Sequence, residues 1–264
     1  MKHIDRQILQ IALPSIVSNI TVPLLGLIDV AIVGHLGSPA YIGAIAVGGM
    51  LFNIIYWIFG FLRMGTSGMT SQAYGKRDLP EIVRLLMRSV GIGLAVALCL
   101  ILLQVPIRQT AFLIIHPTAE VREMATLYFH ICIWGAPAML GLYGLSGWFI
   151  GMQNSRIPMY IAITQNIVNI IASLSFVCFF KMKVEGVAFG TLIAQYAGFI
   201  MGLVLWMSRY GKLKKYILWK GVLQKEAMMR FFQVNRDIFL RTLCLVTVTL
   251  FFTSAGASQG ETHC

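Results

Sequence analysis

Long apolar runs dominate this sequence, and they restrict the chain to one class of fold. Each run is long enough to cross a lipid bilayer as a helix, which takes about 20 residues. We therefore expect an all-α, polytopic transmembrane helix bundle rather than a soluble domain. The seven predicted spans cover about residues 8–34, 41–70, 82–105, 124–150, 157–180, 186–208 and 237–258.

The composition supports this class and excludes others. The 264 residues are 58% hydrophobic and 12% charged, about half the charged fraction of a soluble protein. The net charge of +11 does not indicate a nucleic-acid partner, because the basic residues lie between the apolar runs, as membrane topology requires. The first run is too long for a secretory signal. No phosphate loop or HExxH motif is present, so we expect neither an enzyme nor a cofactor or metal site.

The distribution of basic residues predicts the orientation of the chain. With a cytoplasmic N-terminus, sixteen of the 21 Lys and Arg residues fall on the inner side and four on the outer side. The remaining one, Arg63, lies within the second run. We expect Arg63 to reach the inner headgroups or to close a loop there, a structural role favoured over a substrate role.

The first run contains one carboxylate, Asp29, which is the strongest functional candidate. A charge inside the bilayer is costly, so an intramembrane acid usually has a function, and a buried carboxyl group can hold a proton. Na⁺ binding and helix packing alone are the alternative interpretations. Six residues earlier, Pro23 lacks a backbone donor, which predicts a bend in the helix at this point.

Polar residues of the fifth and sixth runs fall at a similar depth. At ~1.5 Å per helical residue, Asp29 lies ~9 Å below the outer surface, Ser173 ~10 Å and Thr191 ~8 Å. Asn166, Asn169 and Ser173 share one helical face, at positions i, i+3 and i+7. We expect these residues to line a wet pocket around Asp29, although asparagines also join membrane helices without further function.

Four segments then resemble a known family: LPSIVSNITVPLLGLIDVAIVGHLG, FGFLRMGTSGMTSQAYGKRD, GLYGLSGWFIGMQNSRIPMY and EGVAFGTLIAQ. They are similar to the multidrug and toxic compound extrusion (MATE) family, and most of all to its DinF-like branch. The resemblance implies two six-helix lobes around a cavity in the bacterial cytoplasmic membrane. It also implies antiport of amphipathic or cationic compounds against H⁺ or Na⁺.

The resemblance also implies roles for single residues. Asp29 matches the coupling acid of the family's first helix, and Asn169 and Thr191 match polar residues of the same lobe's cavity. Some members carry a second acid one turn after the matched asparagine. Ser173 stands there in this chain, which favours a single proton site.

Family members are roughly twice as long, so the resemblance implies a truncated chain. We expect an N-terminal six-helix lobe at 1–208, a basic cytoplasmic linker at 209–236 and a seventh helix within 237–264. Without the C-terminal lobe, we expect no transport unless two copies pair or the missing half is supplied. A Na⁺-coupled exporter, a non-transporting remnant and, last, a flippase for lipid-linked sugars are the alternatives.

Overall fold

The computed structural model describes residue 16 and residues 30–32, 34, 39–217 and 221–260. Every regular element in these residues is a helix, which confirms the predicted all-α class. The elements are α2 (Pro39–Ile58), α3 (Gly60–Gly75), α4 (Leu79–Leu102), α5 (Gln104–Ile115), α6 (Ala119–Cys132), η1 (Ile133–Gly135), α7 (Ala136–Gly151), α8 (Arg156–Cys178), α9 (Val184–Tyr210), η2 (Gly211–Tyr216) and α10 (Lys225–Gly260).

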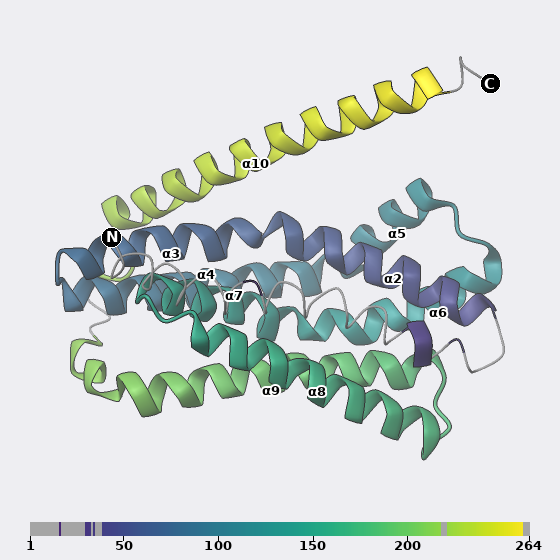
Figure 1. Ribbon diagram of the computed structural model, residues 1–264, viewed down its shortest axis with the longest axis horizontal. Coiled ribbons are helices and arrows are strands. Elements are labelled where there is room, and N and C mark those ends of the chain that lie inside the picture. Colours follow the sequence, from purple (N-terminus) through teal and green to yellow (C-terminus); the bar gives the residue numbers. More distant parts are fainter. Residues whose placement is uncertain (1–15, 17–29, 33, 35–38, 218–220, 261–264) are drawn as a thin grey trace.

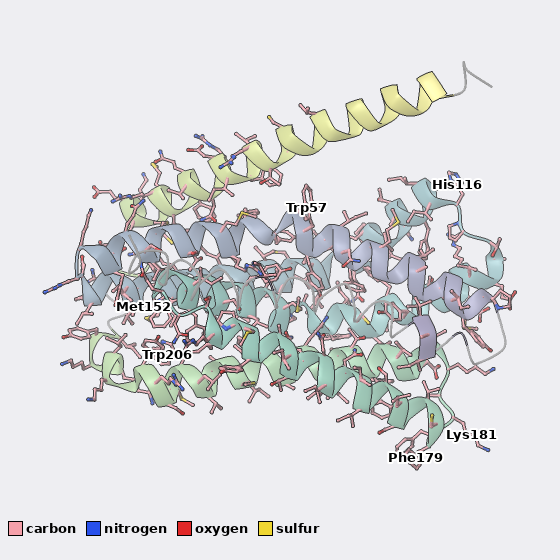
Figure 2. The ribbon with its side chains drawn as sticks, in the orientation of Figure 1. Trp57, His116, Met152, Phe179, Lys181 and Trp206 are labelled. Atoms are coloured by element: carbon pink, nitrogen blue, oxygen red, sulfur yellow. The ribbon has the colours of Figure 1, made fainter. Side chains whose placement is uncertain are left out.

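The helices run lengthwise along the molecule, and α10 lies across one side of the bundle (Figure 1). Met152 lies near one end, whereas His116, Phe179 and Lys181 lie at the other (Figure 2). The Met152 end carries the basic turn after α3 and the start of α8 and of α10. We call it the basic end, and the opposite end the far end.

Five segments of the described part are long and apolar enough to cross a membrane. They are Pro39–Gly75, Leu79–Leu102, Ala119–Gly151, Arg156–Cys178 and Val184–Tyr216. They correspond to the second to sixth predicted spans. The first span falls almost wholly on residues that the structure does not describe, and 237–258 lies within α10. The count of seven therefore stays a prediction.

Three features interrupt or extend the predicted spans. The second span breaks at Phe59, between α2 and α3. The fourth span contains the 3₁₀ turn η1, directly before Pro137, whose missing N–H frees a carbonyl of the preceding turn. The predicted connection 106–123 contains α5, because Pro106 occupies the first turn of that helix, where a missing N–H costs no hydrogen bond.

Glycines allow the central helix α7 to approach its neighbours closely. A Cβ on Gly147 would collide with the carbonyl oxygen of Arg63, and one on Gly151 with Thr70, both on α3. The small-residue stripe of α9 acts in the same way. Gly190 lies against Ser173 and Gly198 against Gln165, both on α8. Small residues at every fourth position of α9 therefore let its backbone pack closely against α8.

An ion-pair cluster fastens the segment before α10 to α4. Arg88 is buried, with 1% of its side chain exposed, and donates to Glu81 Oε1 at 2.6 Å. It also donates to the carbonyls of Val222 at 2.7 Å and Gly221 at 2.9 Å. Gly221 has φ +102°, a conformation that favours glycine. The helix α10 begins at Lys225, inside the range 209–236 that we predicted as linker.

Candidate functional site

A buried polar cluster joins α8 and α9 in the half of the bundle toward the far end. Asn169 Nδ2 donates to Thr191 Oγ1 at 3.1 Å, and both Asn169 and Ser173 are 0% exposed. Ser173 Oγ lies against Gly190, the residue before Thr191. Asn169 Oδ1 and Ser173 Oγ have no hydrogen-bond partner among the described residues. The cluster therefore offers one buried acceptor and one buried donor to a further group.

The structure brings together three of the predicted site residues, Asn169, Ser173 and Thr191. Asn166 lies on the same helix and is half-buried. Asp29 and Pro23 lie outside the described residues, so their positions beside this cluster stay predictions.

A second polar pair, which the sequence analysis missed, lies nearer the centre of the bundle. Gln195 follows Thr191 by one turn of α9, and its amide packs where a Cβ on Gly135 would stand. Tyr56 of α2 and Gln195 are 8% and 9% exposed, and the Tyr56 hydroxyl lies beside the Gln195 amide. The spacing i, i+4 from Thr191 was the available signal.

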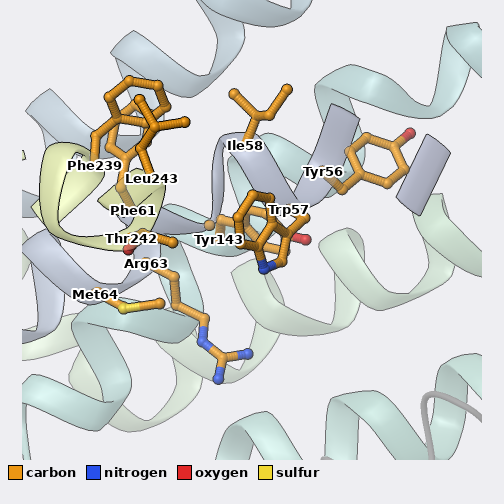
Figure 3. Close-up of a pocket in the computed structure, with 11 residues that line it drawn as sticks. Tyr56, Trp57, Ile58, Phe61, Arg63, Met64, Tyr143, Phe239, Thr242 and Leu243 are labelled. Carbon is orange, nitrogen blue, oxygen red and sulfur yellow. The ribbon is translucent and has the colours of Figure 1, made fainter. Parts of the chain in front are cut away.

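A cavity of about 270 Å³ opens between the α2–α3 break, α7 and α10 (Figure 3). Phe239, Thr242 and Leu243 of α10 form one wall. Arg63 of α3 and Tyr143 of α7 line it as well. We expected a structural role for Arg63 near the inner headgroups. The structure places Arg63 in the wall of a cavity that includes the proposed seventh helix, and its reach to the headgroups stays a prediction.

These groups can bind and orient a ligand by hydrogen bonds. No group of three or more His, Cys, Asp or Glu side chains that could hold a metal ion occurs in the described residues. The geometry therefore consists of a membrane-spanning bundle, a buried hydrogen-bonding cluster and a largely apolar cavity.

The chain belongs to the MatE family, whose model matches residues 14–175. Proteins of this family are transporters embedded in membranes. Among curated relatives, the chain is 37% identical to DNA damage-inducible protein F of Escherichia coli (strain K12), over 97% of this chain and 56% of that protein. It is 24% identical to the chloroplastic protein DETOXIFICATION 44 of Arabidopsis thaliana, over 98% of this chain and 51% of that protein.

Solved structures support the fold. A multidrug resistance MATE family transporter in an outward-facing conformation matches with a TM-score of 0.79 at 19% identity, over 94% of this chain and 55% of its own. The MATE transporter VcmN of Vibrio cholerae, in a bent form, matches with a TM-score of 0.78 at 21% identity, over 96% of this chain and 57% of its own. The chain spans about half the length of the relatives it matches.

Proposed function

We propose that the chain forms the N-terminal lobe and seventh helix of a proton-coupled exporter of amphipathic compounds. The bacterial cytoplasmic membrane, with the N-terminus in the cytoplasm, is the proposed location, because the basic end gathers most Lys and Arg residues. The observation that carries the proposal is the buried Asn169–Thr191 hydrogen bond with Ser173 beside it. A hydrogen-bonding cluster inside a membrane bundle suits a carboxyl group that gains and loses a proton.

The two atoms of this cluster without a hydrogen-bond partner in the described residues fit both charge states of a carboxyl group. Ser173 Oγ–H can donate to the ionised form of Asp29, and Asn169 Oδ1 can accept the proton of the neutral form. In each charge state the carboxyl group then has one hydrogen bond, although it lies away from bulk water. In the proposed cycle, proton loading at Asp29 changes the bend at Pro23 and reshapes the cavity between the two lobes.

Na⁺ coupling is the second candidate. Asn169, Ser173 and Thr191 supply three neutral oxygens, and Asp29 would add the only charge to such a set. Na⁺ requires several oxygen ligands at once, whereas a proton requires one carboxyl group and a hydrogen-bond partner. The cluster therefore favours H⁺ over Na⁺, and a non-transporting remnant is the alternative for the chain by itself.

An efflux assay tests the role of Asp29. The chain would be joined to the second lobe of the Escherichia coli relative and expressed in a strain that lacks its own drug exporters. We expect export of a fluorescent amphipath to fall to background with Asp29→Asn. Asp237→Asn, which removes an exposed carboxylate from α10, is the matched control and leaves efflux unchanged. Normal efflux by a well-expressed Asp29→Asn protein would remove Asp29 from the mechanism.

Proteoliposomes separate the two ions and test the chain alone. With the second lobe present, an imposed pH gradient drives efflux and a Na⁺ gradient does not. We expect residues 1–264 by themselves to give no efflux under either gradient, because the proposed cycle needs a cavity between two lobes. Efflux driven only by Na⁺ would replace the proton proposal with the Na⁺-coupled one.

A further inference from the structure

The cavity between α3, α7 and α10 has one charged lining residue, and it is a cation. Arg63 is exposed, and no ion pair holds it within the described residues. No Asp or Glu lines this cavity in the described part of the chain. A guanidinium group in a largely apolar cavity attracts an anion and disfavours a cation.

The described carboxylates nearby have other partners. Asp237 of α10 is paired with Arg236 at 3.1 Å and does not line the cavity. Glu81 of α4 is held by Arg88 at 2.6 Å. The guanidinium of Arg63 is therefore available to a group from outside the described chain.

Neighbouring side chains supply further donors and an apolar wall. Trp57 carries an indole N–H and is 49% exposed, and Tyr143 carries a hydroxyl. In Figure 3 the guanidinium of Arg63 extends away from the aromatic and aliphatic side chains Phe239 and Leu243. A ligand with an anionic group at one end and an apolar body matches this division.

The position of Arg63 indicates how a bound ligand is oriented across the membrane. Its carbonyl oxygen packs against Gly147, four residues or ~6 Å before the end of α7 at the basic end. An anion bound to Arg63 lies in the half of the bundle that we assign to the cytoplasmic side. The apolar body then extends along α10, toward the middle of the membrane.

We propose that this cavity binds amphipathic anions, in which a carboxylate, sulfate or phosphate group binds Arg63 and an apolar body packs against α10. This inference rests on the proposed exporter function and names its substrate class. The same anionic chemistry occurs in soluble amphipaths and in lipid headgroups.

A binding measurement on the 264-residue protein tests the inference without transport. The protein is placed in nanodiscs of phosphatidylcholine and titrated calorimetrically with pyrenebutyrate and, as its cationic counterpart, pyrenemethylammonium, with empty discs subtracted. We expect tighter binding of the anion. Arg63→Gln weakens anion binding by about tenfold or more, because it removes a charge-assisted hydrogen bond.

Two variants keep the test specific. Arg63→Lys retains the charge and therefore part of the affinity, and it shows that the cavity still folds. Arg209→Gln removes an exposed charge from the last turn of α9 and leaves binding unchanged. Equal or tighter binding of the cation, no binding of either probe, or an Arg63→Gln protein with full anion affinity would overturn the inference.

Anionic lipid distinguishes the two sources of the anion. If phosphatidylglycerol in the discs displaces pyrenebutyrate, the anion bound in the membrane is a headgroup; if it does not, the cavity selects soluble amphipaths. Anion binding without efflux in the two-lobe protein would reject the exporter and keep the inference. Efflux of cations without anion binding would reject the inference alone.

Discussion

Removing the guanidinium of Arg88 should release the segment before α10 from α4. Arg88 joins three acceptors, Glu81 Oε1 and the carbonyls of Gly221 and Val222, at 2.6 to 2.9 Å. Methionine fits the apolar part of the site but donates no hydrogen bond. In Arg88→Met we therefore expect the two carbonyls to lose their partner and the segment to open more often.

The magnitude follows from burial. Removing one partner of a buried ion pair costs about 3–5 kcal/mol. Glu81 is 30% exposed and also lies 3.6 Å from Arg84, so the remaining carboxylate stays partly hydrated and partly paired. We therefore expect a loss near the lower limit, about 3 kcal/mol. At about 2–4 °C per kcal/mol, this corresponds to a fall in Tm of roughly 6–12 °C.

Two assays measure this loss. Thermal unfolding in detergent gives the fall in Tm, and hydrogen exchange of the peptide from Gly221 to Met229 reports local opening, with exchange faster by up to roughly a hundredfold. Arg84→Met is the control, because Arg84 forms only the longer 3.6 Å pair with Glu81 and donates to neither the Gly221 nor the Val222 carbonyl, and such a part-exposed pair contributes about 1 kcal/mol. Equal falls in Tm for both variants, or unchanged hydrogen exchange in Arg88→Met, would refute the proposal that Arg88 holds the segment before α10 against α4.

Two further substitutions test the packing and the polar cluster. Gly147→Ala should lower the free energy of unfolding by about 1–3 kcal/mol, because its Cβ meets the backbone of α3. Gly91→Ala is the control, because a Cβ there meets nothing within 4 Å; it should be neutral or stabilising by up to about 1 kcal/mol. Equal chemical-denaturation midpoints for Gly147→Ala and Gly91→Ala would contradict this packing. Thr191→Val should cost about 1–3 kcal/mol in the same denaturation assay, because Asn169 Nδ2 loses its acceptor, whereas Thr191→Ser should retain the bond. A Thr191→Val protein that is as stable as Thr191→Ser would contradict a stabilising role of this hydrogen bond.

The helices were predictable because membrane spans depend on length and apolarity, which the sequence states directly. The break at Phe59 was not, because no proline marks it and tertiary packing decides it. Burial of Arg88 was equally hidden. A count of basic residues treats every Arg alike. The burial of Arg88 depends on where residues 221 and 222 pass, more than 130 positions away in the sequence.

Within the candidate site, helical spacing placed Asn169 and Ser173 on one face of a helix, and a depth estimate placed Thr191 at a similar level; the structure brings these three side chains together. Spacing within one helix cannot say which side chain of another helix completes the contact, so Tyr56 and Gln195 were missed. The cavity beside Arg63 was not predictable, because a depth estimate along one helix does not include α10, which forms the opposite wall.

The unbroken course of α10 has a mechanical consequence. In Figure 1, α10 is one continuous helix beside the bundle. Its 36 residues measure about 54 Å, and the packing of Asn235 against Gly65 of α3 lies in its first third. A rod supported near one end acts as a lever. With the support at Asn235, a tilt of about 10° displaces the Gly260 end, ~38 Å away, by roughly 6–7 Å and the Lys225 end, ~15 Å away, by ~2.6 Å. A shift of about one hydrogen-bond length beside the Arg88 cluster would thus become a displacement more than twice as large at the Gly260 end.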